Sequence, residues 1–450
     1  MTTPAEQFAA AYDALDASHR MLQAKVQAHA EAIAELYAEI AKINKKIDAC
    51  DCDTVDIDPP VQPGQGFTDL GQPGYVVTVG ASSIDLQHAL YNHEHVGIEA
   101  GAVFSLDRTL NINRPTQTIS VVGEGERPVL YAAKDCHGIN IAASQAIVKL
   151  QGIAVGGPGL PYLGDRVGIR YRLPGNKDGG LNILIEDCDI ARFDTLIELV
   201  DDRSRSLPVP GAEGRISALI RRNILRNAWG SDSHSAGIYT EGVKLATAEG
   251  NVVHHVGYTD DGADPREKRS HGWYAQQYGG RIVALDNWWV DCSANSIQAR
   301  LGGEVTRNVA VRCGVGFVNG SAGGNSTYTG NLVMDQVDIS PDEPRGDAFP
   351  LSGSGHTIKD NLAVRKLGSA TNRTAYRDYW DAAEFSNNGS IGWVPGGDPS
   401  ANWSLNEVPD DFPEFTNDLL DTLLTRPRGV WGQQYETKTF IDAAWSAVEN

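Results

Sequence analysis

One short phrase recurs along the middle of the chain and limits its possible folds more than any other feature. The phrase is a β-type residue, two or three mostly polar residues, an asparagine or a small substitute, and then alternating apolar residues. Its clearest copies are centred on Cys188, Asn223, Asn251, Asn287, Asn308, Asn331 and Asn361. Successive copies lie 21 to 36 residues apart. A repeat of that length is typical of a solenoid, in which each unit contacts only its neighbours.

The residues within each copy indicate strands rather than helices. Val, Ile, Thr and Trp alternate with polar residues and are interrupted by Gly, Asn and Asp. A period of two is the pattern of a β-strand. We therefore predict an all-β solenoid over residues 67–400. The alternative, a twisted β-sandwich, would need hairpin turns, which are scarce in this sequence.

An asparagine at the same bend of every coil has a physical purpose. It tolerates unusual backbone dihedral angles, and its amide can hydrogen-bond to the copies above and below. In this respect the sequence resembles the right-handed parallel β-helix family, the pectate-lyase-like fold with its asparagine ladder. The Gly-His-Gly, Arg-Ile-Lys and Arg-x-Pro-x-x-Arg motifs of enzymes in that family do not occur here. The resemblance therefore implies a fold and transfers no catalytic residue.

The first fifty residues follow a different pattern. Apolar positions recur there at alternating steps of four and three, a period that winds helices around one another in a coiled coil. The seam includes Leu15, Leu22, Val26, Ile33, Leu36, Ile40, Ile43 and Ile47. Isoleucine at neighbouring a and d positions favours more than two strands, so we predict a parallel trimeric stalk over residues 1–50. A dimer, or one amphipathic helix packed on its own globular part, is the alternative.

A connector rich in Pro, Gly and Asp follows the stalk over residues 51–66. Such a composition ends a helix and makes a stiff linker. Cys50 and Cys52 lie where several chains would converge, so they are candidates for interchain disulfide bonds. They could also be free thiols or part of a weak metal site, although a closed zinc site needs four ligands. We predict no cofactor.

Longer spacings between repeats imply insertions, which in solenoids cluster on one face, often the binding face. The insertion between residues 258 and 278 contains the highest density of charged, histidine and aromatic side chains that could act in catalysis or binding. Glycoside hydrolysis needs two carboxylates, and a polysaccharide lyase needs a cation beside the uronate and a base for its C5 proton. The catalytic candidates are Asp260, Asp261, Asp264 and His271. The candidates for glycan binding are Glu241, Lys268, Arg269, Trp273 and Tyr274. The alternative is a solvated loop whose charges pair with one another.

The charge of the chain argues against several kinds of partner. With 38 basic and 58 acidic side chains in 450 residues, the formal charge is −20. Nucleic acids and anionic membranes both attract cationic surfaces, so we expect no nucleic-acid partner and no membrane insertion. The N-terminal residues lack the basic and apolar segments of a signal peptide, so we expect no export by that route.

After residue 367 the repeat fades and aromatic residues become frequent. We expect residues 401–450 to form a cap that closes the open end of the solenoid. The last part of this segment, residues 438–448, has the spacing of a short amphipathic helix. Its apolar face is Ile441, Ala444, Trp445 and Val448.

The order of stalk, connector, solenoid and cap resembles a bacteriophage tailspike or virion fibre. The resemblance implies a homotrimer on the virion exterior, assembled in the host cytoplasm and attached to other virion proteins by its stalk. It also implies that the β-helix binds, and could degrade, host cell-surface polysaccharide. A lyase and a glycoside hydrolase both remain open. The other hypotheses are a purely structural collar, neck or head fibre, and a free polysaccharide-degrading enzyme.

Overall fold

A computed structural model describes residues 67–449, apart from 133–135, 158–165, 176–177, 203–213, 231–233, 259–268, 277–278, 301, 320–323, 338–345, 354, 367–373, 380–382 and 394–400. The chain divides into two units, Met1–Gln62 and Pro63–Asn450, and the described residues all belong to the second. The predicted coiled coil, the connector and the Cys50–Cys52 pair lie outside the described residues. They therefore stay predictions.

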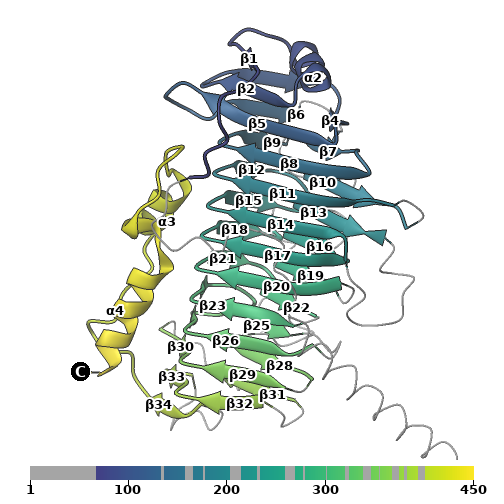
Figure 1. The fold of residues 1–450 in the computed structure, drawn as a ribbon. Coiled ribbons are helices and arrows are strands. Elements are labelled where there is room, and N and C mark those ends of the chain that lie inside the picture. Colours follow the sequence, from purple (N-terminus) through teal and green to yellow (C-terminus); the bar gives the residue numbers. More distant parts are fainter. Residues whose placement is uncertain are drawn as a thin grey trace, which may run out of the picture. The chain divides into compact units, whose positions relative to one another are not determined.

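The second unit is a solenoid of parallel strands (Figure 1). Sheet A consists, in spatial order, of β1 (Tyr75–Val77), β2 (His95–Glu99), β5 (Thr116–Val122), β8 (Gln145–Gln151), β11 (Gly180–Glu186), β14 (Ile216–Arg221), β17 (Val243–Glu249), β20 (Gly279–Leu285), β23 (Gly303–Thr306), β26 (Ser326–Thr329), β29 (His356–Lys359) and β32 (Ala383–Ser386). Sheet B consists of β3 (Val103–Leu106), β6 (Val129–Ala132), β9 (Ala154–Gly156), β12 (Asp189–Ala191), β15 (Ile224–Ala228), β18 (Val252–Val256), β21 (Trp288–Cys292), β24 (Val309–Val311), β27 (Leu332–Met334), β30 (Leu362–Val364), β33 (Gly389–Ile391) and β34 (Trp403–Leu405).

The third face is sheet C. It consists of β4 (Leu110–Ile112), β7 (Ile139–Ile141), β10 (Val167–Leu173), β13 (Thr195–Asp201), β16 (Ala236–Glu241), β19 (His271–Ala275), β22 (Asn295–Ala299) and β25 (Val315–Asn319). A pair, β28 (Phe349–Leu351) and β31 (Tyr376–Asp378), follows it along the chain. Each strand pairs with the strand one coil earlier and one coil later, so the predicted parallel β-helix is confirmed.

The core consists of side chains that stack on their equivalents from coil to coil. In sheet C one register row contains only large buried residues: Ile169, Ile197, Ile238, Trp273, Ile297 and Phe317. Because side chains alternate between the two faces of a strand, the residues next to these point outward. This alternation decides which residues of sheet C are available to a ligand.

The asparagine ladder lies at the bend between sheets A and B. The Asn251 side-chain oxygen accepts from the backbone N–H of Asn223 at 3.0 Å and from its side-chain amide at 2.9 Å. The same pattern is repeated to Asn402, two asparagines beyond the copies recognised in the sequence. From Cys188 to Asn388 the residue before each bend has a positive φ, as at Arg222 (φ 55°) and Asp286 (φ 55°). The asparagine amide supports this bend in coil after coil.

A helix that the sequence did not predict, α2 (Ser83–Asn92), packs on the first strands at the N-terminal end of the solenoid (Figure 1). Ser82 starts it with a capping box, in which its hydroxyl accepts from the Asp85 backbone N–H at 3.2 Å. Three residues of the helix itself are buried: Leu86, Ala89 and Leu90. The helix covers the first coil, whose core would otherwise contact water.

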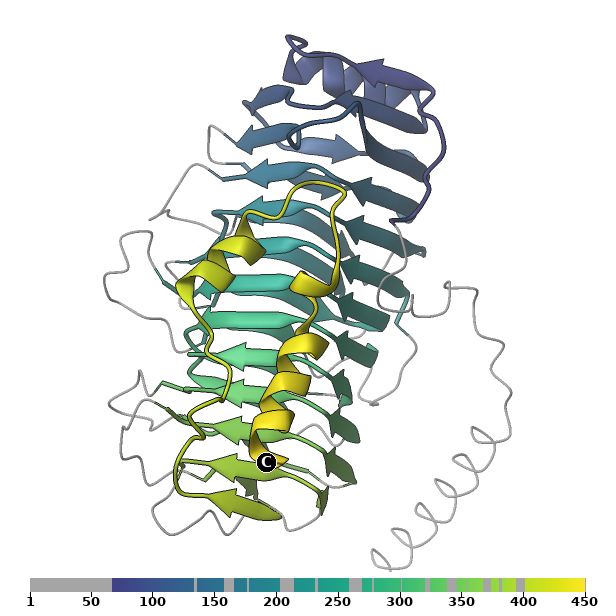
Figure 2. The same cartoon turned by 90° about the vertical axis from the view of Figure 1, so that its left-hand side faces the viewer.

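The C-terminal segment differs from the expected cap. Strand β34 extends the solenoid to Leu405, and then α3 (Asn417–Leu424), the 3-10 turn η2 (Gln433–Tyr435) and α4 (Thr437–Glu449) lie along the outer face of sheet B (Figure 2). The outward side chains of sheet B are apolar from β18 onward, including Val252, Trp288 and Leu332. The helices cover this apolar strip.

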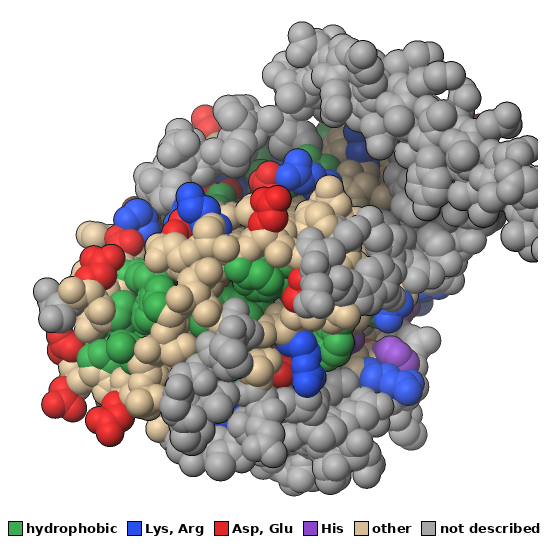
Figure 3. Space-filling model, turned by 90° about the horizontal axis from the view of Figure 1, so that it is seen from below, with side chains coloured by type: hydrophobic (Ala, Val, Ile, Leu, Met, Phe, Trp, Pro, Cys, Tyr) green, Lys and Arg blue, Asp and Glu red, His purple; other side chains and the backbone are tan. Residues whose placement is uncertain are grey.

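The described helices do not lie across the C-terminal end of the last coil, which α4 contacts only from the side of sheet B (Figures 1 and 2). Seen from that end, hydrophobic side chains are visible at the surface (Figure 3). Tyr379 and Leu405 are among the exposed apolar residues. The predicted helix is present as α4, with Ile441 and Ala444 buried, but it packs against sheet B. Within the described part of the chain, no helix combines the length and apolar character needed to cross a bilayer.

Candidate functional site

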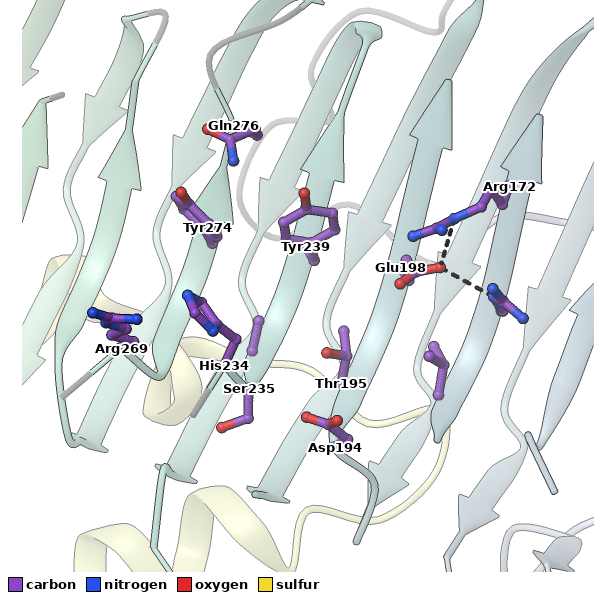
Figure 4. A pocket seen from close by; sticks show the side chains of 13 residues that line it. Arg172, Asp194, Thr195, Glu198, His234, Ser235, Tyr239, Arg269, Tyr274 and Gln276 are labelled. Carbon is purple, nitrogen blue, oxygen red and sulfur yellow. Dashed lines mark hydrogen bonds and ion pairs between the residues drawn. The ribbon is translucent and has the colours of Figure 1, made fainter. Parts of the chain in front are cut away.

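The outer face of sheet C carries a pocket of about 370 Å³ (Figure 4). Strands β10, β13, β16 and β19 form its floor, and the segments that lead into them complete its wall. Insertions between repeats enter the solenoid at these same strands. The pocket therefore lies where the solenoid pattern predicts a binding face.

Four outward side chains form a single row across the floor. Arg170 lies in register with Glu198, Glu198 with Tyr239, and Tyr239 with Tyr274. Neighbouring strands are about 4.8 Å apart, so successive residues of the row are neighbours on the outer face. The row has an ionic half and an aromatic half.

The ionic half is built around Glu198. Its Oε1 atom lies 3.1 Å from Nε of Arg170 and 3.6 Å from Nε of Arg172 (Figure 4). Two guanidinium groups thus share one carboxylate, and Asp194 adds a second carboxylate to the lining of the pocket. Arg269 adds a third guanidinium at the opposite end of the lining. On a chain with a formal charge of −20, such a grouping favours an anionic or strongly polar ligand.

The aromatic half consists of two tyrosines held by buried neighbours. The rings of Tyr239 and Tyr274 are 5.6 Å apart and tilted by 59°. The Tyr239 hydroxyl donates to Oε2 of Glu241 at 2.7 Å, and the His271 ring lies 4.8 Å from the Tyr274 ring. Each tyrosine offers an apolar ring and a polar hydroxyl, a combination that suits ligands with both kinds of surface.

The structure divides the predicted glycan-binding residues into three groups. Arg269 and Tyr274 line the pocket. Glu241 is buried, 2% exposed, and acts on the pocket through its hydrogen bond to Tyr239. Trp273 is fully buried, and its Nε1 donates to Oγ1 of Thr240 at 3.1 Å. Trp273 was a candidate for glycan binding, but alternation along β19 turns its indole into the core, where it cannot contact a ligand on the outer face.

The predicted catalytic residues are only partly described. His271 is 6% exposed, and its ring packs against the ring of Tyr274. Asp260, Asp261, Asp264 and Lys268 lie outside the described residues, and their roles stay predictions.

Three of the four residues in the row were missed in the sequence: Arg170, Glu198 and Tyr239. They belong to different repeats, and insertions of unequal length separate them. Aligning the repeats strand by strand would have placed them in one row with Tyr274. Among the described residues, no group of three or more His, Cys, Asp or Glu side chains is arranged to hold a metal ion.

Neither a protein-family model nor a curated protein sequence matches the chain. Among solved structures, pectate lyase Pel9A is similar with 11% identity and a TM-score of 0.47, covering 79% of this chain and 86% of its own. The Dettilon tailspike protein has 13% identity and a TM-score of 0.42, with 73% and 68% covered. An alginate lyase from Paenibacillus sp. str. FPU-7 has 15% identity and a TM-score of 0.36, with 74% and 98% covered. The fold assignment rests on the strand register of this chain.

Proposed function

We propose that the chain is a homotrimeric virion spike that binds host surface polysaccharide through the pocket on sheet C. The observation that carries this proposal is the row of Arg170, Glu198, Tyr239 and Tyr274 on the outer face of the solenoid. A row of guanidinium, carboxylate and phenol groups can hydrogen-bond hydroxyl groups while its rings pack on the apolar faces of sugars.

A polymer suits this surface better than a small molecule. The row continues beyond the pocket, because Asn140 lies in register before Arg170 and Gln298 lies in register after Tyr274. All these strands are stacked along one axis, so a chain lying along that axis meets one outward side chain in every coil. Polar groups at regular spacing provide many weak contacts of the kind a polysaccharide can use.

The virion part of the proposal is supported by the sequence. The heptad seam of residues 1–50 favours self-association, and the connector would separate it from the β-helix. In this arrangement the stalk attaches to other virion proteins and the β-helix remains exposed to the host surface. Interchain bridges at Cys50 and Cys52 would strengthen the junction.

The test is to incubate the full chain with capsular polysaccharide and lipopolysaccharide of the host bacterium. Binding is measured by co-sedimentation or calorimetry, and cleavage by new reducing ends and by absorbance of unsaturated uronates. We expect binding that is lost from a Tyr239→Ala, Tyr274→Ala double variant that remains folded. A chain that binds neither polymer contradicts the glycan role and leaves the structural collar, neck or head fibre. Labelling the chain on particles then decides where it is located.

A further inference from the structure

The three outer faces of the solenoid have different surroundings. The C-terminal helices cover sheet B, and the pocket lies on sheet C. Sheet A carries neither of these features. Figures 1 and 2 show the C-terminal helices on the side of sheet B.

The outer face of sheet A contains a strip without charge. We define the neutral strip as two neighbouring register rows on β11, β14, β17 and β20. These rows contain Asn182, Ser217 and Leu245 on one side and Leu184, Leu219, Thr247 and Val283 on the other. Charged residues surround the strip: Lys149, Arg281 and Glu304 lie at its ends. The buried residues Glu186, Arg221 and Glu249 form the next register row along one side. In the whole chain, 21% of residues are charged.

The neutral strip is also partly apolar. Leu219, Leu245 and Val283 are half-buried although they point away from the core, and Leu184 is 9% exposed. Ile147, next to the strip on β8, is 47% exposed. Solvent-facing positions of a sheet are normally polar, and a contiguous apolar group on such a face marks an interaction surface.

Threefold symmetry indicates that the neutral strip contacts other copies of the same chain. The heptad seam favours a parallel trimer, which places three β-helices side by side around one axis. Residues beside a threefold axis lie close to their own copies, where any charge would be repelled by an identical charge. Serine, threonine and aliphatic side chains can meet their own copies without that cost. The neutral strip has this composition.

We infer that the neutral strip of sheet A is the surface by which the three β-helices contact one another. The inference rests on the proposed trimer and adds to it the face that points toward the axis. Sheet C with its pocket then remains on the outside of the assembly, where a polysaccharide can reach it. The C-terminal helices of the same subunit already cover the apolar outer face of sheet B.

Cysteine cross-linking tests this arrangement in the full chain. Ser217→Cys lies on the neutral strip, and Gln298→Cys, on the outer face of sheet C, is the matched control. Both are made in a Cys50→Ser, Cys52→Ser background, and that parent is measured alongside to correct for the remaining thiols. Each protein is treated with a short bis-maleimide and analysed on denaturing gels, while light scattering gives the oligomeric state without cross-linker.

We expect a trimer in which Ser217→Cys yields cross-linked dimers in at least fivefold greater amount than Gln298→Cys. A trimer in which Ser217→Cys does not exceed the control overturns the inference and leaves the proposed function standing. A monomer overturns the proposed trimer, and the inference fails with it. The two failures are therefore distinguishable.

Discussion

The guanidinium of Arg426 donates to Oδ1 of Asp187 at 2.9 Å, although 239 positions separate the two residues in the sequence. Both side chains are buried, with 0% and 2% exposure. Arg127 donates to the same carboxylate at 2.7 Å, and the Gly429 N–H donates to its other oxygen at 2.7 Å. The bend between α3 and α4 is thus fixed to one coil of the solenoid.

We expect Arg426→Met to loosen the C-terminal helices. Removing one partner of a buried ion pair costs about 3–5 kcal/mol, and we expect the lower end of this range because Arg127 still pairs with Asp187. The melting temperature should fall and proteases should cut the last forty or so residues first. Arg428→Met is the control, since the Arg428 guanidinium donates to the exposed carbonyls of Gly123 and Gly125. Equal melting temperatures for the two variants would contradict this role of Arg426.

Asparagines of the ladder should matter far more than asparagines on the surface. The Asn287 amide donates to the Ala248 carbonyl at 2.9 Å and to Asn308 at 2.9 Å, and its oxygen accepts from Asn251. Asn287→Ala leaves several buried groups without partners, each costing about 1–3 kcal/mol. We expect a loss of at least about 3 kcal/mol in denaturant unfolding. Exposed Asn417→Ala, in α3, should change stability by less than about 0.5 kcal/mol, and similar losses for both would count against the ladder.

Stability should fall in acid partly through Asp291. Burial alone would raise the pKa of this carboxyl, but hydrogen bonds from Arg312 and His254 outweigh it and lower the pKa to about 2, from an ordinary value of 3.8. Because the folded state favours the charged form, the contribution is complete above about pH 4 and is lost as the pH falls toward 2. The shift corresponds to about 2 kcal/mol.

The variant that tests this acid dependence is Asp291→Asn. Asp291 has a φ of 52°, and asparagine tolerates that backbone region, so the substitution removes the charge without new strain. We expect a lower melting temperature at pH 7 and a flatter decline between pH 4 and pH 2 than in the unaltered protein. Parallel curves for the two proteins over this range would exclude Asp291 as a source of the acid dependence.

Alanine substitutions at two adjacent residues of β19 should affect different properties, one the stability of the fold and the other the binding of polysaccharide. Trp273 lies in the core, so Trp273→Ala should destabilise the protein by about 3–5 kcal/mol. Tyr274 faces the pocket, so Tyr274→Ala should leave the melting temperature within a few degrees and weaken polysaccharide binding. Calorimetric unfolding and binding of both variants check the pair. If Tyr274→Ala proved the more destabilising of the two, the assigned register of β19 would be incorrect.

Much of the fold could be predicted because its determinants are local and repeated. Each bend needs a side chain that supports a positive φ at the residue before it, and asparagines such as Asn251 and Asn308 occur at those bends in the sequence. The helix α2 was missed because one short helix between strands has no repeat to reveal it. The position of α4 was misjudged, although Trp288-Trp289 and Leu332-Val333 indicated strands buried on both faces.

The site was harder to predict because it depends on register. Arg170, Glu198 and Tyr239 are unremarkable within their own repeats and become neighbours only when parallel strands align. Alternation along a strand could have shown that Trp273 and Tyr274 cannot both face the same ligand. The candidate loop drew attention through its density of charge, whereas the described pocket is formed by strands.

Binding of polysaccharide by the row on sheet C is tested most directly by titrating host capsular polysaccharide or lipopolysaccharide into three proteins. These are the full chain, its Tyr274→Ala variant and a Tyr131→Ala control from sheet B. We expect at least a tenfold loss of affinity for Tyr274→Ala, about 1.4 kcal/mol, and no change for Tyr131→Ala. Equal affinities for all three proteins would contradict binding by the row.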